Sequence, residues 1–417
     1  MIDTPARSTR TGATLRLREP KRLLVVSHVV HYQHEGNLAA YGPYAREIDI
    51  WADLFETVVI AAPLSHAQPP GDCLAFTRKN ISLCPQREAG GDTLRAKLGL
   101  LAAVPSLVLG LARAMRGADA IHVRCPGNLG LLGVVLAPLF SQCLVAKYAG
   151  QWNGYDGEPL STRLQRRMLR STWWRGPVTV YGNWPDQPAH IVPFFTSMMT
   201  SELVRHAVTV AETKRIESPL RILFSGTLQA RKRVDALIDA VRILVDAQVP
   251  VKVAIVGDGP ERANLQERAG DLEQRGIIQF IGALPYEESL RWFEWAHCLV
   301  LPSRHSEGWP KVIAEGMCYG AVCVGVAHGQ VPSMLAGRGI LLPTGSPIEI
   351  ADALRDVAAA PAQYQPVVQA ASQWARQFSL DGLRSALAEL LTHHWSLRSP
   401  EVGSIAARAV PLSPEAR

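Results

Sequence analysis

Ten short apolar runs that alternate with helical patterns are the feature that most restricts how this chain can fold. The runs are rich in Val, Ile and Leu and lie at residues 22–27, 57–62, 120–123, 143–148, 178–182, 221–226, 251–257, 277–282, 298–303 and 321–326. Strands that are apolar along their length and separated by helices are typical of parallel sheets covered on both faces. The sequence therefore predicts an α/β fold with two Rossmann-like, doubly wound parallel sheets that face each other across a cleft.

At 417 residues the chain is long enough for two domains, and a polar stretch at 192–220 with no expected strand separates the two sets of runs. The expected parts are a disordered tail (1–20), an N-terminal domain (21–195), a linker (196–218), a C-terminal domain (219–378), a helix that returns to the N-terminal domain (379–395) and a second disordered tail (396–417). Doubly wound sheets bind ligands at the carboxyl ends of their strands, so the site is expected between the domains.

The net charge of +6 and the isoelectric point near 9.0 favour an anionic partner. Aromatic residues make up 7% of the chain and no nucleic-acid motif is present, so a phosphorylated small molecule or an anionic membrane surface is expected rather than nucleic acid. The seven cysteines form no CxxC pair and mostly lie in apolar runs, which predicts reduced core residues of a cytoplasmic protein. Residues 1–20 lack the apolar segment of a signal peptide.

Two glycine turns follow strands in the second half of the chain. At 224–240 a strand leads through Gly226 and a basic cluster with Lys232 into a helix, and the backbone N–H groups of such a turn suit an anion. A solvated basic helix start explains this stretch equally well. The second turn, Gly257-Asp258-Gly259-Pro260, is better explained as a tight structural turn than as a nucleotide motif.

Glu307 and Glu315 stand eight residues apart around Pro310, which favours a helix from about Trp309 to Tyr319. Glu315 sits among small apolar residues, where a buried carboxylate needs hydrogen bonds such as those from sugar hydroxyls. A capping glutamate plus a surface glutamate accounts for the pair equally well. Metal binding and nucleophilic catalysis are poorer accounts, because no His or Asp with ligand spacing lies nearby and no GxSxG motif occurs.

Five blocks in the second half, taken in order, resemble the C-terminal half of GT-B glycosyltransferases of the GT4 type (glycosyl transferases group 1). The blocks are FSGTLQARKRVDALIDA (224–240), VGDGP (256–260), FIGALPYEESLRWFEWAHCLVLPS (280–303), SEGWPKVIAEGMCYGAVCV (306–324) and GQVPSML (329–335). The Glu-x7-Glu element is the most specific of them. The N-terminal half matches more loosely, through EGNLAAYGPYAREIDIWADLF (35–55) and IHVRCPG (121–127), so the resemblance extends over about 21–395.

The resemblance implies roles for both glutamates and for the basic cluster. Glu315 would hold the ribose hydroxyls of a nucleotide, Glu307 would hold hydroxyls of the transferred sugar, and Lys232 would neutralise the diphosphate. The further donor-binding positions that it implies are Gly226, Thr227, Arg231, Gly257, Gly308, Trp309, Pro310, Lys311 and Val312. A solvated surface cation is the alternative for Lys232.

One departure weakens the implied diphosphate clamp, because the family usually has an arginine where this chain has Thr227. Arg231 or Arg233 would have to compensate for it. Cations in this place would stabilise the charge that develops on the β-phosphate as the sugar leaves.

In the N-terminal half the resemblance implies that His122, at the end of a strand, approaches the donor sugar, with Arg124 beside it on the acceptor side. Gly36 would correspond to the loop that lets the acceptor and a phosphate approach, although the family motif there is richer in glycine. A histidine enclosed in the core is an equally good account of His122.

The implied reaction is a retaining transfer of a sugar from a nucleotide diphosphate sugar to a hydroxyl of a glycan or lipid-linked acceptor, with no obligatory metal. Domain closure would exclude water and limit hydrolysis of the donor. The expected setting is cell-envelope, exopolysaccharide or glycolipid synthesis, in the cytoplasm or at the inner face of the membrane. A GT-B sugar phosphorylase, a nucleotide-sugar epimerase and a non-catalytic nucleotide-sugar binder are the alternatives.

A basic, amphipathic stretch at 161–176 suggests contact with an anionic membrane surface. The residues concerned are Arg163, Arg166, Arg167 and Arg170 on one helical face, and Leu164, Met168, Trp173 and Trp174 as apolar anchors. A solvated helix beside a core tryptophan is the alternative account.

Overall fold

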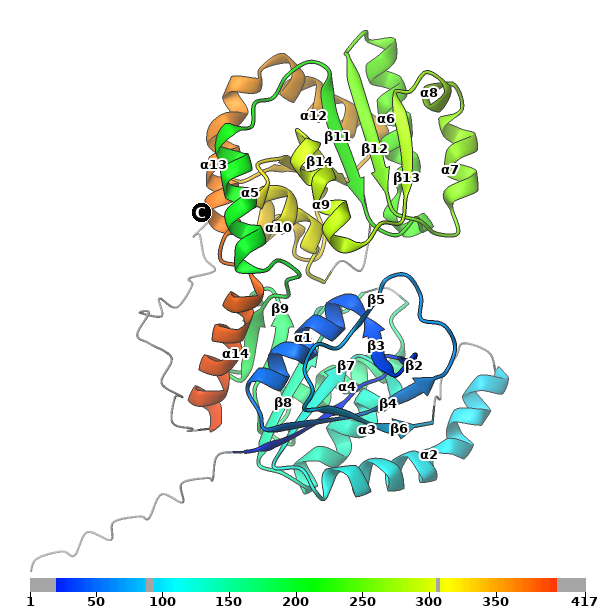
Figure 1. The fold of residues 1–417 in the computed structure, drawn as a ribbon, viewed down its shortest axis with the longest axis vertical. Helices are drawn as coiled ribbons and strands as arrows, with labels where there is room; N and C mark the ends of the chain where they lie inside the picture. The colour runs from blue at the N-terminus through cyan, green and yellow to red at the C-terminus, as the bar shows by residue number, and fades with distance from the viewer. Residues whose placement is uncertain (1–19, 88–93, 156, 305–307, 396–417) are drawn as a thin grey trace, which may run out of the picture.

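The computed structural model of the chain describes residues 20–87, 94–155, 157–304 and 308–395. They form two α/β bodies stacked end to end, with the N-terminal domain below the C-terminal domain in Figure 1. The α/β class with two parallel-sheet domains, expected from the sequence, is confirmed. Glu307 and the expected tails at 1–19 and 396–417 lie outside the described residues.

The N-terminal sheet has ten strands in the order β10-β9-β8-β7-β1-β4-β2-β3-β5, with β6 also paired to β4. Its strands are β1 (Arg22–Val26), β2 (His31–His34), β3 (Asn37–Tyr41), β4 (Thr57–Ser65), β5 (Cys73–Ala75), β6 (Ile81–Gln86), β7 (Ala120–Cys125), β8 (Cys143–Tyr148), β9 (Val178–Tyr181) and β10 (Ile191–Phe194). All pairings are parallel except those of β3 with β2 and β5. The five apolar runs of the first half form β1, β4, β7, β8 and β9, as expected.

The expectation of no strand within 192–220 is wrong at both ends, since β10 covers 191–194 and β11 starts at Leu220. The β2–β3 hairpin was also missed, because β2, with the sequence HYQH, contains no apolar run. Its turn places Glu35 at φ +49° and Gly36 at φ +80°, the left-handed backbone that tight hairpins use.

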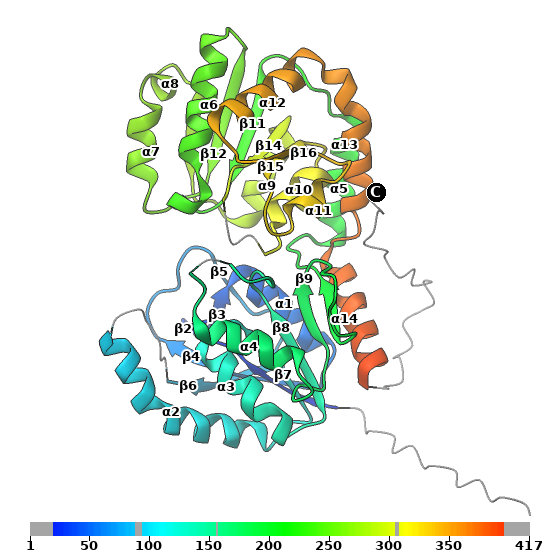
Figure 2. The same ribbon diagram turned by 180° about the vertical axis from the view of Figure 1, so that it is seen from behind.

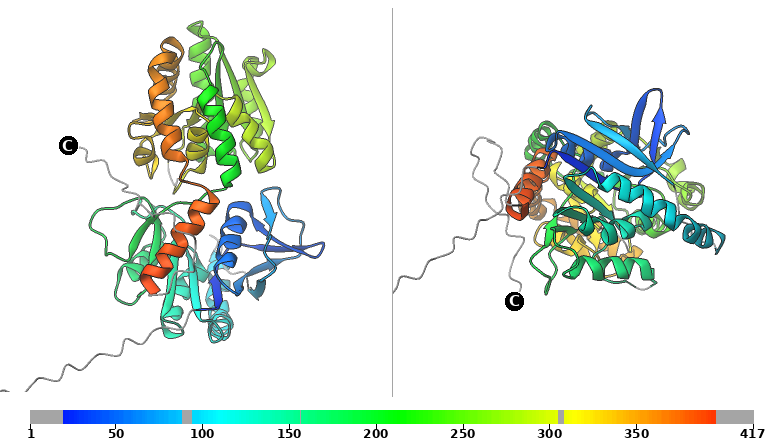
Figure 3. Two further views of the ribbon diagram at one scale, coloured as in Figure 1. Left: turned by 60° about the vertical axis from the view of Figure 1, so that its left-hand side comes forward. Right: turned by 90° about the horizontal axis from the view of Figure 1, so that it is seen from below.

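Helices cover both faces of the N-terminal sheet (Figure 2). One face carries α2 (Leu94–Met115), α3 (Asn128–Leu136), the short 3₁₀ helix η1 (Ala137–Leu139) and α4 (Leu160–Arg170). The other face carries α1 (Gly42–Asp53) and α14 (Leu380–Trp395), the last helix of the described chain. Figure 3 shows α14 leaving the C-terminal domain and lying along the N-terminal one, where Trp395 Nε1 donates to Leu144 O at 3.1 Å.

The C-terminal sheet has six parallel strands in the order β13-β12-β11-β14-β15-β16. They are β11 (Leu220–Ser225), β12 (Val251–Val256), β13 (Ile278–Gly282), β14 (Cys298–Leu301), β15 (Val322–Val326) and β16 (Ile340–Leu342). All five apolar runs of the second half are strands of this sheet, and β16 is the strand that the sequence pattern missed.

Two layers of helices enclose the C-terminal sheet. One layer is α6 (Val234–Asp246), preceded by the 3₁₀ helix η2 (Ala230–Lys232), with α7 (Arg262–Ala269), α8 (Asp271–Gln274) and α12 (Pro347–Ala359). The other is α5 (Ser201–Thr213), α9 (Tyr286–Trp295), α10 (Lys311–Cys318), α11 (Val331–Leu335) and α13 (Pro361–Ala375). Helix α5 lies within the expected linker, but it buries Val204 and Ala207 in the core of this domain.

Candidate active site

Glu315 occupies the second turn of α10, where the chain passes between the two domains. Its side chain is buried, and the Tyr286 hydroxyl donates a hydrogen bond to Oε1 at 2.9 Å. A small pocket beside it is lined by Thr196, Ser197, Met199, Lys311, Ala314 and Phe378. Burial raises the pKa of Glu315, while Lys311 and the Tyr286 hydrogen bond oppose that rise. The carboxylate is therefore oriented by Tyr286 beside a small pocket at the junction of the domains.

Helix α10 begins directly after Pro310, and no side chain of the described residues caps its amino end. Its first residue, Lys311, adds a positive charge to the positive end of the helix dipole. Gly308 precedes it at the junction of the domains, and Val312 is half-buried. The start of α10 therefore favours an anionic group.

Trp309 is enclosed rather than lining the site. Its ring centroid lies 4.9 Å from that of Phe378 and 6.2 Å from that of Phe195, in the apolar junction where the chain crosses between the domains. Only 8% of Trp309 is exposed, so the indole ring serves packing at this junction, and a donor contact of this residue would have to come from its backbone amide.

The basic cluster lies on the loop from β11 to α6. Gly226 and exposed Thr227 follow the strand, Lys232 ends η2, and Arg233 adopts a left-handed backbone with φ +53° at the start of α6. Arg233 Nη1 donates to Gly345 O at 3.1 Å, which ties this arginine to the loop before α12 and leaves its other N–H donors for a second partner.

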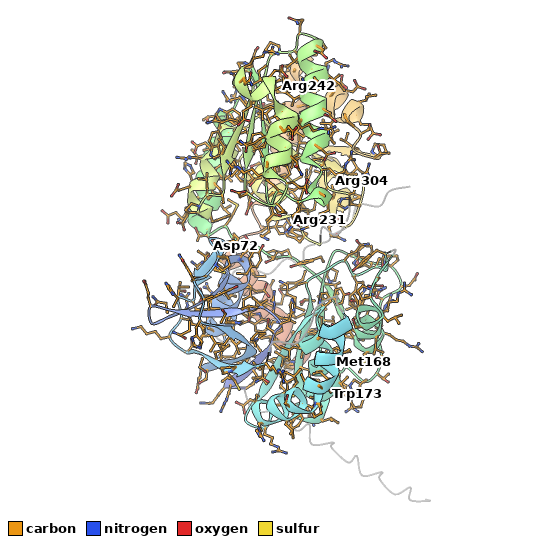
Figure 4. The ribbon with its side chains drawn as sticks, turned by 90° about the vertical axis from the view of Figure 1, so that its right-hand side faces the viewer. Asp72, Met168, Trp173, Arg231, Arg242 and Arg304 are labelled. Carbon is orange, nitrogen blue, oxygen red and sulfur yellow. The ribbon has the colours of Figure 1, made fainter. Side chains whose placement is uncertain are left out.

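Arg231 is exposed on the same loop, and its carbonyl accepts from Arg304 N at 3.3 Å. Figure 4 shows Arg231 and Arg304 at the edge of the C-terminal domain that faces the N-terminal one, with Asp72 on the opposing edge. Lys232 and Arg231 are therefore the cations that this loop presents.

The glycine turn after β12 supports that loop from behind. A Cβ atom on Gly257 would lie 1.9 Å from Gly226 O, and one on Gly259 would lie 2.4 Å from Leu228 O. Gly257 thus allows two backbone turns to touch, which agrees with the structural-turn account. A separate cavity of about 290 Å³ lies between the starts of α6 and α7, lined by Gln229, Glu261 and Arg268 among others, and it lies apart from Glu315.

His122 does not lie at the end of its strand, and its enclosed ring agrees with the alternative account, a histidine in the core. Strand β7 continues to Cys125 rather than stopping at 123, which leaves His122 in mid-strand with no exposed surface. Its ring lies 4.5 Å from that of Trp51, and neither ring nitrogen has a hydrogen-bond partner among the described residues. Burial and the charge of Arg124 lower the pKa of His122 to about 3, so the imidazole is neutral.

Arg124 comes two residues later and is tied into a buried cluster. Its Nη1 donates to Glu47 Oε1 at 2.6 Å, and Lys147 Nζ donates to Glu47 Oε2 at 2.6 Å. Burial would raise the pKa of Glu47, but Arg124 and Lys147 lower it to about 2. Gly36, the other acceptor-side position, lies at the tip of the β2–β3 hairpin with open space around it.

Gly308 of the C-terminal domain and Gly182 of the N-terminal domain each lie against a side chain of the other domain. A Cβ on Gly308 would lie 2.6 Å from the Tyr181 ring, which belongs to the N-terminal domain. A Cβ on Gly182 would lie 1.9 Å from the side-chain amide of Gln330, at the start of α11. The C-terminal domain is therefore seated on the carboxyl end of β9.

Sequence reasoning did not single out Glu47, Lys147, Tyr181, Tyr286 or Gln330. A weak signal was present for Lys147, since it is the one charged residue in an otherwise apolar strand. No group of three or more His, Cys, Asp or Glu side chains suited to a metal ion occurs among the described residues. None of the helices in the described ranges is long and apolar enough to cross a bilayer.

Residues 209–374 match the model of the family described as glycosyl transferases group 1. D-inositol 3-phosphate glycosyltransferase of Streptomyces avermitilis is 31% identical over 182 residues, which cover 41% of this chain and 39% of that protein. The amylovoran biosynthesis glycosyltransferase AmsK of Erwinia amylovora is 29% identical over 163 residues, which cover 37% of this chain and 40% of that protein. The chain spans about two fifths of the length of these curated relatives.

Two solved structures resemble the whole described chain. HepE of Anabaena, in complex with UDP and glucose, gives a TM-score of 0.64 at 16% identity and covers 89% of this chain and 99% of its own. Sucrose-phosphate synthase from Thermosynechococcus elongatus gives a TM-score of 0.64 at 18% identity and covers 90% of this chain and 99% of its own. At such identities the likeness shows the fold, which is the two-domain GT-B fold.

Proposed function

We propose that this chain, whose residues 209–374 match the model of the glycosyl transferases group 1 family, moves a sugar from a nucleotide diphosphate sugar to an acceptor hydroxyl. The observation that carries the proposal is Glu315, buried at the junction of the domains and oriented by Tyr286 beside a small pocket. A carboxylate in this setting can accept hydrogen bonds from two ribose hydroxyls, and the start of α10 can receive a phosphate.

In the proposed mechanism the leaving group is the nucleotide diphosphate. Lys232 and Arg231, on the loop after β11, and the amino end of α10 stabilise the charge that develops on the β-phosphate. Glu307 is assigned to the hydroxyls of the transferred sugar on the family pattern alone. We propose front-face transfer, in which the leaving phosphate accepts the proton of the acceptor hydroxyl and the anomeric configuration is retained.

Product stereochemistry tests this mechanism. The full chain is incubated with UDP-, GDP-, ADP- and dTDP-sugars and a membrane or glycan extract, and the new glycosidic bond is examined by NMR. Retention is expected, and EDTA is expected to leave the rate unchanged because we propose no obligatory metal. An inverted anomeric centre would contradict the proposed mechanism.

Non-catalytic binding of a nucleotide sugar is the second candidate, and one observation favours it. Thr227 stands where the family usually has an arginine, so the phosphate loop has one cation fewer than the family pattern provides. Turnover of any nucleotide sugar by the wild-type chain, lost in Glu307→Ala, would rule this candidate out. A strict requirement for inorganic phosphate or for free UDP would instead indicate a phosphorylase or an epimerase.

For the acceptor we propose a glycan or lipid-linked sugar in envelope, exopolysaccharide or glycolipid synthesis, on the cytoplasmic side of the membrane. The names of the relatives support this choice, since one acts in amylovoran biosynthesis.

A surface on the outer side of the N-terminal domain supports it too. Four large apolar residues are exposed there: Leu139 (65%), Leu160 (79%), Leu164 (47%) and Trp173 (40%). Figure 4 shows Met168 and Trp173 on the same side of this domain.

The cationic part of this surface is smaller than the sequence suggested. Arg166 is buried in a two-pronged ion pair with Glu158, and Trp174 is buried as well, so neither can contact a membrane. Arg170 is exposed as well, but its Nε donates to Gln187 Oε1 at 2.9 Å. That leaves exposed Arg163, whose Nε lies 3.6 Å from Glu158 Oε2, and exposed Arg167, next to the exposed leucines of α4. Together they suit an anionic lipid surface.

Reversing these two charges should abolish membrane binding. Each arginine near an anionic surface contributes about 1 kcal/mol, so Arg163→Glu with Arg167→Glu should weaken binding at least ~100-fold. Flotation with phosphatidylcholine vesicles, with and without phosphatidylglycerol, measures it. The control carries Arg205→Glu and Arg291→Glu, exposed on α5 and α9 of the C-terminal domain. Equal flotation of both double variants would contradict the proposed docking surface.

Domain closure should depend on Gly182. Alanine there would place its Cβ on the Gln330 amide and would also have to adopt φ +84°. Because the domains would then seat incorrectly, we expect Gly182→Ala to lower kcat/KM about 10- to 100-fold with little change in nucleotide affinity. The control is Gly337→Ala, which has φ +67° and no atom within 4 Å of the new Cβ. If both variants lose activity equally, backbone strain and not closure is the cause.

A further inference from the structure

The cluster of Glu47, Arg124 and Lys147, here called the buried cluster, sets two basic side chains against one carboxylate. Burial lowers the pKa of Lys147, and the carboxylate of Glu47 opposes that effect. Arg124 and Lys147 are register partners on the adjacent parallel strands β7 and β8, so their side chains leave the sheet on the same face. Helix α1 crosses that face and places Glu47 between them (Figure 1). The three residues are 7, 4 and 3% exposed, in the order Arg124, Lys147, Glu47.

Neither cation is fully satisfied by the residues around it. A guanidinium carries five N–H donors and an ammonium three. Within the described part of the chain, Arg124 and Lys147 each make one hydrogen bond, and both go to Glu47. Their other close neighbours are aromatic faces, Tyr44 at 4.8 Å from Arg124 Cζ and Tyr181 at 5.4 Å from Lys147 Nζ. A buried excess of positive charge with unused donors is costly unless an anion compensates it.

The cluster lies where an anionic group of a substrate can reach it. Arg124 and Lys147 are the next-to-last residues of their strands, at the edge of the sheet that meets the C-terminal domain. Tyr181, above Lys147, contacts Gly308 of that domain. His28, after β1, lies close by, and burial together with the charge of Arg124 lowers its pKa, so it adds no further positive charge at neutral pH.

We propose that the buried cluster binds one oxyanion, a phosphate or a carboxylate, carried by the acceptor. The existence of the anion site rests on the cluster itself, and its assignment to the acceptor rests on the proposed glycosyl transfer. The donor diphosphate has its own cations on the opposite domain, at Lys232 and Arg231. An acidic acceptor would therefore be recognised by the N-terminal domain while the C-terminal domain holds the donor.

The experiment uses inorganic phosphate as the probe and the full chain as the protein. Phosphate is titrated by calorimetry at constant ionic strength into the wild type, Lys147→Met and the control Lys252→Met, with and without saturating UDP. Lys252 is an exposed cation of β12 that is bonded to Gly276 O, on the other domain. Losing one charge-assisted contact should raise the apparent Kd of phosphate at least ~10-fold in Lys147→Met and leave it unchanged in Lys252→Met.

Lys147→Met leaves Glu47 and Arg124 as a neutral pair, so this variant is expected to fold. If Lys147→Met lowers the melting temperature, Lys147→Gln is used in its place. Equal phosphate affinity in the wild type and the Lys147 variants, or no phosphate binding by the wild type, would overturn the site. Loss of phosphate binding in the presence of UDP would assign the cluster to the donor and overturn the acceptor assignment. UDP binding by the same proteins reports separately on the proposed function.

Discussion

Glu315→Ala should weaken binding of the donor nucleotide about 100-fold or more. The variant loses hydrogen bonds from two ribose hydroxyls to a carboxylate, each contributing about 1.5–3 kcal/mol, and about 1.4 kcal/mol corresponds to a tenfold change in affinity. The fold should survive, because the change removes a buried carboxylate whose pKa is already raised by burial. Calorimetric titration of UDP into both proteins gives the affinities, and circular dichroism checks the fold.

Two further variants define the role of Glu315. Tyr286→Phe removes only the hydroxyl that donates to Glu315 Oε1 at 2.9 Å and orients the carboxylate. It should therefore weaken the affinity for UDP about 5- to 10-fold. Glu307→Ala should instead lower turnover and leave UDP affinity near the wild-type value, because we assign Glu307 to the sugar. If the two glutamate variants change affinity and turnover alike, this division of labour is wrong.

Lys232→Met should lower the rate of sugar transfer by about 10²–10³, the usual cost of removing one preorganised electrostatic group from a transition state. Lys232 lies on a loop that is fixed on both sides, by the Arg233 bond to Gly345 O and by the glycine turn at Gly257. Its charge is therefore positioned before the leaving group develops negative charge. Initial rates with the preferred nucleotide sugar, and the affinity for UDP, measure the effect.

The control for Lys232→Met is Lys252→Met, which removes a lysine of the same domain whose Nζ is bonded to Gly276 O at 2.7 Å. It should leave the rate within about twofold, since a surface contact of this kind contributes little to function. If Lys232→Met leaves the rate nearly unchanged, Arg231 or the start of α10, and not Lys232, stabilises the leaving group.

The parallel strands were predictable because burial on both faces demands continuous apolar runs, as in β1 and β12. The β2–β3 hairpin escaped prediction because β2 has no apolar run, and the hairpin lies near the edge of the sheet, with β5 next to it, where less burial is needed. Strand β10, with the sequence IVPF, is only four residues long and sits beside a polar stretch. Its pattern was too short to identify.

The site was predictable where one stretch of sequence determines it, and not where the fold brings distant residues together. Glu315 and the loop with Lys232 fall within local motifs. His122 was misplaced because two more residues of β7 move it from the strand end into the core. Glu47 and Lys147 are 100 residues apart, and their contact depends on the packing of α1 across β8. No local pattern in the sequence reports that packing.

The most direct test of the account is a thermal-shift screen of the wild-type chain against UDP-, GDP-, ADP- and dTDP-sugars. A ligand that binds only the folded state stabilises it by about 2.7 kcal/mol at a hundred times its Kd, which gives a shift of several degrees. The account predicts that one nucleotide family raises the melting temperature and that Glu315→Ala abolishes the rise. No shift with any nucleotide sugar, or a shift of equal size in Glu315→Ala, would contradict it.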